Sequence, residues 1–97
     1  MQTFHDVDPA ELRTPPSRPV ADPGKFARQL SRYGRSVAGM PPIQVFESTD
    51  GFYVIADGVT RATRVAKLLP GQSVRVVIIG PYGRKAVGRP TIRETLP

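Results

Sequence analysis

Apolar residues recur along the chain with two different periods, and the change of period marks the expected elements. After Asp22-Pro23, apolar residues follow one another at spacings of four, three and four: Phe26, Leu30, Tyr33 and Val37. Because an α-helix has 3.6 residues per turn, these positions share one face. We therefore expect an amphipathic helix that Gly34 weakens near its end and that Gly39 stops.

The middle of the chain alternates in the manner of β-structure. Residues 43–47 and 52–55 are rich in β-branched and aromatic residues, and Asp50-Gly51 lies between them. This pattern predicts a hairpin, since Asp-Gly favours turn positions with positive φ. Helical spacing returns from Thr60 to Leu69. The apolar run at residues 74–79 is expected to form a central strand that is buried on both faces.

These elements predict one small α+β domain over residues 24–80, with a lead-in near residue 7. Its layout is an amphipathic N-terminal helix, a β-hairpin, a second helix and a central strand. Residues 1–23 are rich in proline and are expected to form an extended, partly disordered arm, in which Asp8 caps one helical turn at Pro9. Residues 81–97 are expected to be a mobile basic tail, with residues 91–93 as an alternative edge strand.

Charge is unevenly distributed along the 97 residues. The chain has 14 Lys and Arg against eight Asp and Glu, and residues 24–97 hold twelve of the cations and four of the acids. This surplus favours an anionic partner such as nucleic acid, a nucleotide or a phosphorylated ligand, and a plain solvated surface would explain it equally well.

The composition also excludes several kinds of chemistry. There is no cysteine and only one histidine, His5, so disulfides, thiol catalysis, a zinc site and a Ser-His-Asp triad lack the residues they need, and no metal site is predicted. No apolar run approaches the length of about 18 residues that a membrane span requires. The first residues show no secretory signal, and a cytoplasmic location without membrane association is expected.

The strongest candidate site is the junction Asp57-Gly58-Val59-Thr60-Arg61, where the hairpin leads into a helix. Free backbone N–H groups at a helix start can point at a phosphate, and the Arg61 guanidinium can bind phosphate oxygens in a bidentate manner. Thr60 offers a hydroxyl, and Arg64 flanks the site. Asp57 has two interpretations: it caps the helix, or it holds a metal or a ribose.

A second candidate is a basic stripe on the first predicted helix. Lys25, Arg28, Arg32 and Arg35 recur at spacings of three, four and three, apart from the apolar face. They form a candidate nucleic-acid surface, and an ordinary solvated helix face is the alternative interpretation.

Taken in order, several segments resemble the N-terminal domain of ParB proteins, which has the ParB/sulfiredoxin fold. The matching segments are Leu30-Ser31-Arg32-Tyr33-Gly34, Pro42-Ile43-Gln44-Val45, Asp50-Gly51-Phe52-Tyr53-Val54-Ile55, Gly58-Val59-Thr60-Arg61 and Val74-Arg75-Val76-Val77. The resemblance covers roughly residues 7–80. It implies a nucleotide site, with CTP and magnesium as candidates, from Gly58 to Arg61.

The chain also departs from that family's pattern. Val59 and Thr60 replace a charged pair that is usual in CTP-hydrolysing members, and Arg64 stands where alanine is usual. The absence of cysteine excludes sulfiredoxin chemistry. The helix-turn-helix that follows in partition proteins is not present, so DNA recognition of the partition type is not expected.

Three functional hypotheses follow. The first is a binding module for a nucleotide or nucleic-acid phosphate at residues 57–64. The second is a non-catalytic accessory domain that binds a protein partner through the Pro-rich arm or the basic tail. The third is a nuclease or nucleotide hydrolase, for which Asp57, Glu47 and Asp50 are the available carboxylates. The loss of the polar pair at residues 59 and 60 favours the accessory role over an enzyme.

Overall fold

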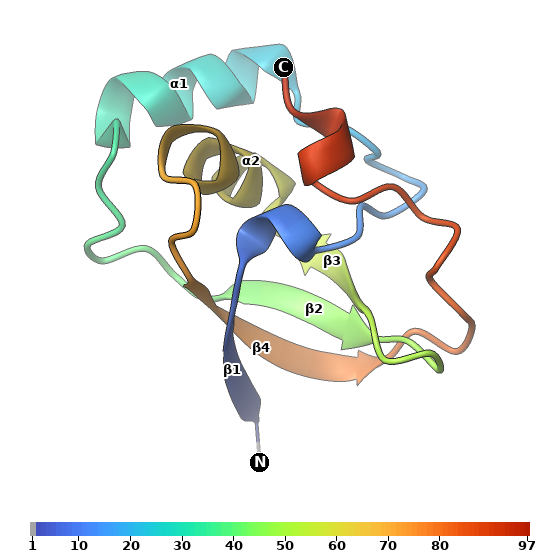
Figure 1. Cartoon of the computed structure of the whole chain (residues 1–97). Helices are drawn as coiled ribbons and strands as arrows, with labels where there is room; N and C mark the ends of the chain where they lie inside the picture. Colours follow the sequence, from blue (N-terminus) through green and yellow to red (C-terminus); the bar gives the residue numbers. More distant parts are fainter. Residues whose placement is uncertain (1) are drawn as a thin grey trace.

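The protein is a small α+β domain built on one mixed sheet. The computed structural model describes residues 2–97, so Met1 of the predicted arm lies outside the described residues. The strands are β1 (Thr3–Val7), β2 (Ile43–Glu47), β3 (Tyr53–Asp57) and β4 (Val74–Pro81). Their order in the sheet is β1-β4-β2-β3, with β4 and β2 parallel and the two outer pairs antiparallel (Figure 1). The α-helices are α1 (Pro23–Tyr33) and α2 (Val59–Leu68), and the short 3-10 helices are η1 (Pro9–Glu11) and η2 (Arg93–Thr95).

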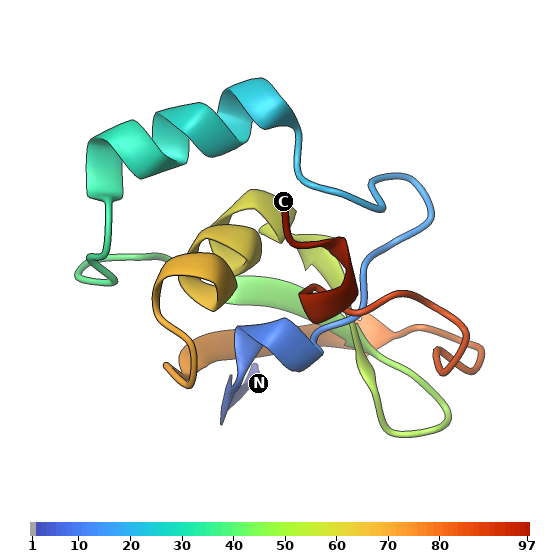
Figure 2. The ribbon, with the colours of Figure 1, turned by 45° about the horizontal axis from the view of Figure 1, so that its top comes forward.

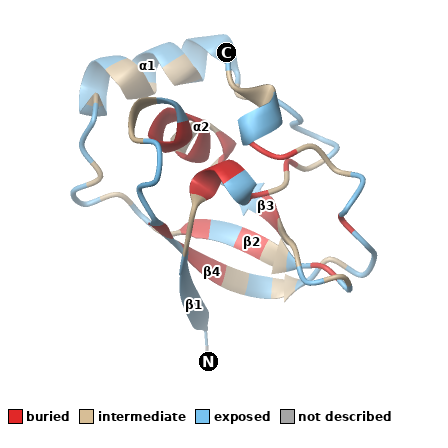
Figure 3. Ribbon diagram, in the orientation of Figure 1, coloured by how far each residue is buried: buried red, intermediate tan, exposed pale blue. Residues whose placement is uncertain are grey.

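The helices cover one face of the sheet in two layers. Helix α2 lies next to the sheet, and α1 lies on the side of α2 away from the sheet in both ribbon views (Figures 1 and 2). The core fills the space between the sheet and α2, with Val45, Ile55, Val65 and Val76 fully buried. Buried residues concentrate in α2 and the adjoining strands, whereas α1 contains none (Figure 3). None of the helices in residues 2–97 is long and apolar enough to cross a bilayer.

The central elements agree with the sequence-based expectations. Gly51 adopts φ 86° in the hairpin turn, and α2 begins one residue before the predicted position. Asp22 caps α1 by accepting a hydrogen bond from the Lys25 N–H at 2.9 Å. Helix α1 ends at Gly34, whose φ of 54° is unfavourable for other residues, and therefore stops five residues before Gly39.

Strand β4 is central, as predicted, but it is not buried on both faces. Val74 and Val76 point into the core. On the opposite face Val77 is buried, whereas Arg75 and Ile79 are exposed, so this face is only partly covered. No helix of the described chain covers that face (Figure 1). The apolar run alone could not reveal this, because such a run occurs both in strands that are buried on one face and in strands that are buried on both.

The arm that was expected to be partly disordered is instead ordered and adds to the sheet at residues 3–7 and at Arg13. Strand β1 pairs with β4, and Asp8 caps η1 with Pro9 as its first residue, as predicted. The chain then reaches the opposite edge of the sheet. There the Arg13 N–H donates to the Tyr53 carbonyl and the Ile55 N–H donates to the Arg13 carbonyl, each at 2.9 Å.

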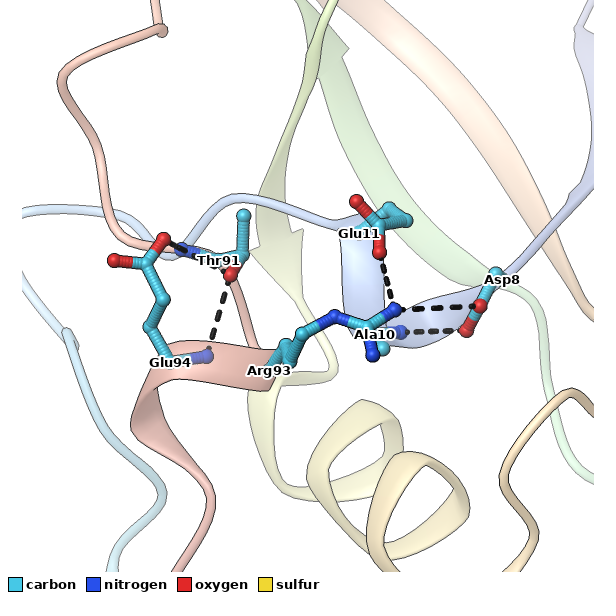
Figure 4. Close-up of polar contacts among 6 residues, drawn as sticks. All are labelled: Asp8, Ala10, Glu11, Thr91, Arg93 and Glu94. Atoms are coloured by element: carbon cyan, nitrogen blue, oxygen red, sulfur yellow. Dashed lines mark hydrogen bonds and ion pairs between the residues drawn. The ribbon is translucent and has the colours of Figure 1, made fainter.

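The expected mobile tail over residues 81–97 is also corrected, because this segment packs on the body. Ala86 and Ile92 are fully buried, and the Ile92 N–H donates to the Leu12 carbonyl at 2.8 Å. Residues 93–95 form η2 and not an edge strand. Arg93 pairs with Glu11 and Asp8, and these ion pairs join η2 to η1 (Figure 4). Thr91 and Glu94 form hydrogen bonds to each other at the start of η2.

We expect Ile92→Ala to lower the free energy of unfolding by about 2–5 kcal/mol, because it leaves a cavity in the core. Val87 provides the control, since it belongs to the same segment but is 63 % exposed. Val87→Ala should change stability by less than about 0.5 kcal/mol in the same urea titration. Equal effects of the two substitutions would contradict the packing of this segment.

A second prediction concerns Asp50, whose carboxylate accepts hydrogen bonds from the Ser48 hydroxyl and from the N–H groups of Ala86 and Val87. Desolvation opposes its charge, but these hydrogen bonds outweigh that effect and lower the pKa of Asp50 below its usual range. The stabilisation is therefore present above the unfolded-state pKa of about 3.9 and is lost as the pH falls through the lower folded-state pKa.

Asp50→Asn should accordingly destabilise the protein at neutral pH, and the difference from the wild type should shrink in acid. Urea titrations between pH 7 and pH 2 measure this. A difference that stayed constant over that pH range would show that the charge of Asp50 has no role.

Candidate functional site

The candidate site is centred on the start of α2. Gly58 precedes the helix with φ 120°, and a Cβ at this position would lie 3.1 Å from the Ile43 side chain. Backbone conformation and space therefore both require glycine. The first amide of the helix to bond within it is that of Ala62, which donates to the Gly58 carbonyl at 2.9 Å. The preceding N–H groups have no partner within the helix, and the positive end of the helix dipole lies there.

Asp57 does not cap α2, so the predicted capping role was wrong. The helix has no side-chain cap, and Asp57 Oδ2 accepts a hydrogen bond from Arg61 Nη2 at 3.1 Å. The reason is positional: Gly58 occupies the capping position, so Asp57 lies one residue too early. The Asp57 side chain is 71 % exposed and faces the same space as Arg61.

Arg61 is fixed by contacts on two sides. Besides Asp57, its guanidinium donates to the backbone carbonyls of Pro41 at 3.1 Å and Pro42 at 3.5 Å. Its side chain is only 16 % exposed. Arg61 therefore links the start of α2 to the segment that enters β2, and it keeps a fixed place in the wall of the site.

Arg64 does not flank the site as a free cation, which corrects the prediction for this residue. It is 1 % exposed, and it donates from Nη1 to the carbonyls of Gly34 at 2.8 Å and Ser36 at 2.7 Å. Its Nε donates to Gln29 Oε1 at 3.2 Å. Burial lowers the pKa of Arg64 from its usual value, but a guanidinium remains charged in proteins. The buried charge is thus satisfied by carbonyl and amide oxygens and is not available to a ligand.

The two predicted sites lie on one pocket of about 320 Å³ between α1 and the start of α2. The stripe on α1 contributes Lys25, Arg28 and Arg32, and the α2 junction contributes residues 57–61, including Gly58, Thr60 and Arg61. Arg35, the last member of the predicted stripe, does not line this pocket. We call this space the cationic pocket. Its walls come from α1, from the start of α2 and from the proline-rich segment at Arg18.

Arg18 also lines the cationic pocket, although its position in the sequence does not predict this. It lies between Pro16 and Pro19, in a segment that gives no periodic signal. Its neighbours indicate an extended backbone, but they do not indicate which part of the domain the segment contacts. Its charge was the only available signal.

The pocket is strongly cationic. Five cationic side chains line it, against the single carboxylate of Asp57. Arg61 pairs with that carboxylate, while no ion pair within residues 2–97 involves Arg18, Lys25, Arg28 or Arg32. Their charges are therefore available to an anion. At the start of α1, the hydrogen bond from the Lys25 N–H lowers the pKa of Asp22, and the charges of Lys25 and Arg28 add to this effect.

Two further cavities adjoin the cationic pocket. One, of about 360 Å³, shares Tyr33, Asp57 and Arg61 with it and continues to Ala38, Met40 and Pro41. The other, of about 290 Å³, shares Arg18, Asp57 and Gly58 and continues to Pro15. A ligand larger than one phosphate group therefore has space on either side of the α2 start.

Comparison with known proteins adds no relative to this picture, since no protein-family model and no curated protein matches the chain. Within residues 2–97, no three His, Asp or Glu side chains form a group that could hold a metal ion. The chemistry that the geometry provides is the binding of an anion by N–H groups and cations.

We predict that Arg61→Ala lowers the free energy of unfolding by about 1–2 kcal/mol, because two backbone carbonyls and Asp57 lose their donor. Arg32→Ala is the matched control, since Arg32 also lines the pocket but has no hydrogen-bond partner among the described residues, and it should change stability by less than about 0.5 kcal/mol. Thermal or urea unfolding measures both. A structural role for Arg61 is contradicted if its removal is as harmless as that of Arg32.

Proposed function

We propose that this protein binds a phosphate-bearing ligand, a nucleotide or a nucleic-acid segment, in the cationic pocket. The observation that carries the proposal is the convergence of four cations without an ion pair on the open N-terminal end of α2. Phosphates are favoured there for two independent reasons, since the helix start offers N–H groups and the side chains offer charge.

Each part of the pocket has a distinct role in this proposal. Gly58 lets the ligand approach the backbone closely, and the N–H groups of the first turn of α2 bind phosphate oxygens. Thr60 lines the pocket and offers a hydroxyl, and Arg61 presents a guanidinium whose position is fixed by Pro41 and Asp57. Arg28 and Arg32 approach from α1 on the opposite wall.

The cavity that continues past Arg61 favours a nucleotide over a bare phosphate. It adjoins the cationic pocket at Tyr33 and Arg61, and Met40 and Pro41 add apolar surface. Ligand pockets commonly combine an apolar region with a few convergent polar groups. A nucleotide would place its phosphates at α2 and its nucleoside against these residues.

A ParB/sulfiredoxin-like layout is the finer fold that we propose. Its support is the resemblance in the sequence together with the order of elements, in which the β2–β3 hairpin leads through Gly58 into α2 and then to β4. Val59 is buried and Thr60 is not charged, so the charged pair of CTP-hydrolysing members has no counterpart. The proposal accordingly concerns binding and does not include hydrolysis.

A protein-binding accessory role is the second candidate. It is favoured by two exposed large apolar residues, Val20, which precedes α1, and Tyr33, which is its last residue. An apolar cavity of about 300 Å³ also lies between α1 and the end of the chain. This role predicts no saturable binding of nucleotides.

The decisive experiment is an amide-resolved NMR titration with CTP, other nucleoside triphosphates and pyrophosphate, with and without magnesium. Saturable shifts centred on residues 57–61 are expected. Arg28→Ala combined with Arg32→Ala should weaken the affinity by about tenfold or more, because charged hydrogen bonds to the phosphates are lost.

Arg35→Ala is the charge-matched control for either single substitution, Arg28→Ala or Arg32→Ala, because Arg35 belongs to the same basic stripe but does not line the pocket. It should leave the affinity almost unchanged. An equal loss for Arg35→Ala would indicate unspecific attraction to a basic surface, and an absence of shifts at millimolar ligand would contradict the proposed function.

A further inference from the structure

Helix α1 carries three of the cations of the cationic pocket, but few contacts attach it to the domain. None of its residues is buried, and Phe26 and Leu30 are only half-buried. Apart from bonds to its own flanking residues, one hydrogen bond within the described chain joins Pro23–Tyr33 to the rest, between Gln29 and Arg64. The wall that presents Lys25, Arg28 and Arg32 therefore depends on very few interactions.

Arg64 of α2 provides the hydrogen bond that joins α1 to the rest of the described chain. All its polar contacts fall on residues 29–40, which comprise the second half of α1 and the segment that follows it. Its charge lies at the C-terminal end of α1, where the Gly34 carbonyl accepts its hydrogen bond at 2.8 Å. A cation is favoured at this end of a helix dipole, and the last carbonyls of a helix need such donors. The Tyr33 ring lies 5.3 Å from the Arg64 guanidinium carbon and adds a cation–π contact.

We propose that Arg64 is a positioning residue that holds α1 in place as the cationic wall of the pocket, and that anion binding in the pocket orders α1. This inference rests on the proposed function for its second part. Arg64 borders the adjoining cavity of about 360 Å³ but does not line the cationic pocket. It is 1 % exposed and its donors are occupied by Gln29, Gly34 and Ser36, so it does not bind the phosphates itself.

The proposed ordering of α1 by a bound anion follows from the charges on the two walls of the cationic pocket. Without an anion, the three cations of α1 face Arg18, Arg61 and the positive end of α2, and like charges across an open pocket repel. A polyanion between the walls replaces this repulsion with attraction on both sides. Since the ligand then binds the closed arrangement better than an open one, it shifts the population of α1 towards the closed arrangement.

The test measures hydrogen exchange of the amides in residues 25–36 of the full chain, with and without pyrophosphate, and the affinity for pyrophosphate by calorimetry. In the wild type, pyrophosphate should slow exchange in residues 25–36 relative to the amides of β2 and β4. In Arg64→Met, exchange of residues 25–36 should become faster without ligand, while β2 and β4 remain protected. The pyrophosphate affinity should fall by about tenfold or more, since the α1 cations are no longer held in place.

Arg64→Lys separates position from charge. A lysine keeps the charge and can donate to the Gly34 or Ser36 carbonyl, but it cannot at the same time replace the hydrogen bond from Arg64 Nε to Gln29. Protection of α1 and affinity should therefore recover together and only in part. Full recovery of affinity without recovery of α1 protection would show a long-range charge effect and would overturn the positioning role.

The remaining outcomes are also decisive. Binding of pyrophosphate with no change of α1 exchange would overturn the coupling but leave the proposed function intact, whereas no binding would contradict both. Unchanged α1 exchange in Arg64→Met would overturn the positioning role regardless of binding. If Arg64→Met fails to fold, Gln29→Ala removes the bond of α1 to Arg64 from the other side, and it must speed exchange of residues 25–36 without ligand for the positioning role to stand.

Discussion

The fold depends on one short segment that holds both edges of the sheet. Residues 3–7 pair with β4 at one edge, and Arg13 pairs with β3 at the other, while Leu12 between them is buried in the core. Unpaired strand edges expose backbone donors and acceptors. This segment supplies hydrogen-bond partners for the edges that β4 and β3 would otherwise expose. The last residues of the chain pair with the same segment, since Thr91 forms a bridge with Arg13. Strand β3 is thus held between β2 and Arg13, and this fixes where Asp57 and Gly58 place the start of α2.

Local signals in the sequence were sufficient for the elements inside the domain. Asp50-Gly51 specified the hairpin, the spacing of Ala62, Val65, Ala66 and Leu69 specified α2, and Asp22-Pro23 specified the start of α1. The predictions for the two ends of the chain were wrong for a common reason. Leu12 and Ile92 are single apolar residues in polar, proline-containing surroundings. They are about 80 residues apart in the sequence, yet the Ile92 N–H donates to the Leu12 carbonyl. No periodicity can express a pairing of that kind, so the proline content wrongly indicated disorder and mobility.

In the candidate site, too, the sequence predicted local features but not contacts between distant segments. The residue types at Gly58, Thr60 and Arg61 and the spacing of Lys25, Arg28 and Arg32 were enough to select two candidate sites, but not to predict that they share one pocket. Arg64 was misassigned because the sequence contains no sign of its acceptors. Those acceptors are the backbone carbonyls of Gly34 and Ser36, which become available only because α1 ends at Gly34. A buried guanidinium without a carboxylate is satisfied here by a helix end, and that arrangement requires the tertiary structure.

The arginines of the site therefore divide into two groups with different consequences for binding. Arg61 and Arg64 are fixed by backbone carbonyls and shape the walls, whereas Arg18, Arg28 and Arg32 have no such partners among the described residues. The free side chains lose conformational freedom when they contact a ligand, at a cost of about 0.5–1.5 kcal/mol each. A single phosphate can engage only some of them and must offset that cost with few contacts. An anion with several phosphates can span both walls and engage more of the cations at once. Under the proposed function we therefore expect di- and triphosphates to bind more tightly than monophosphates.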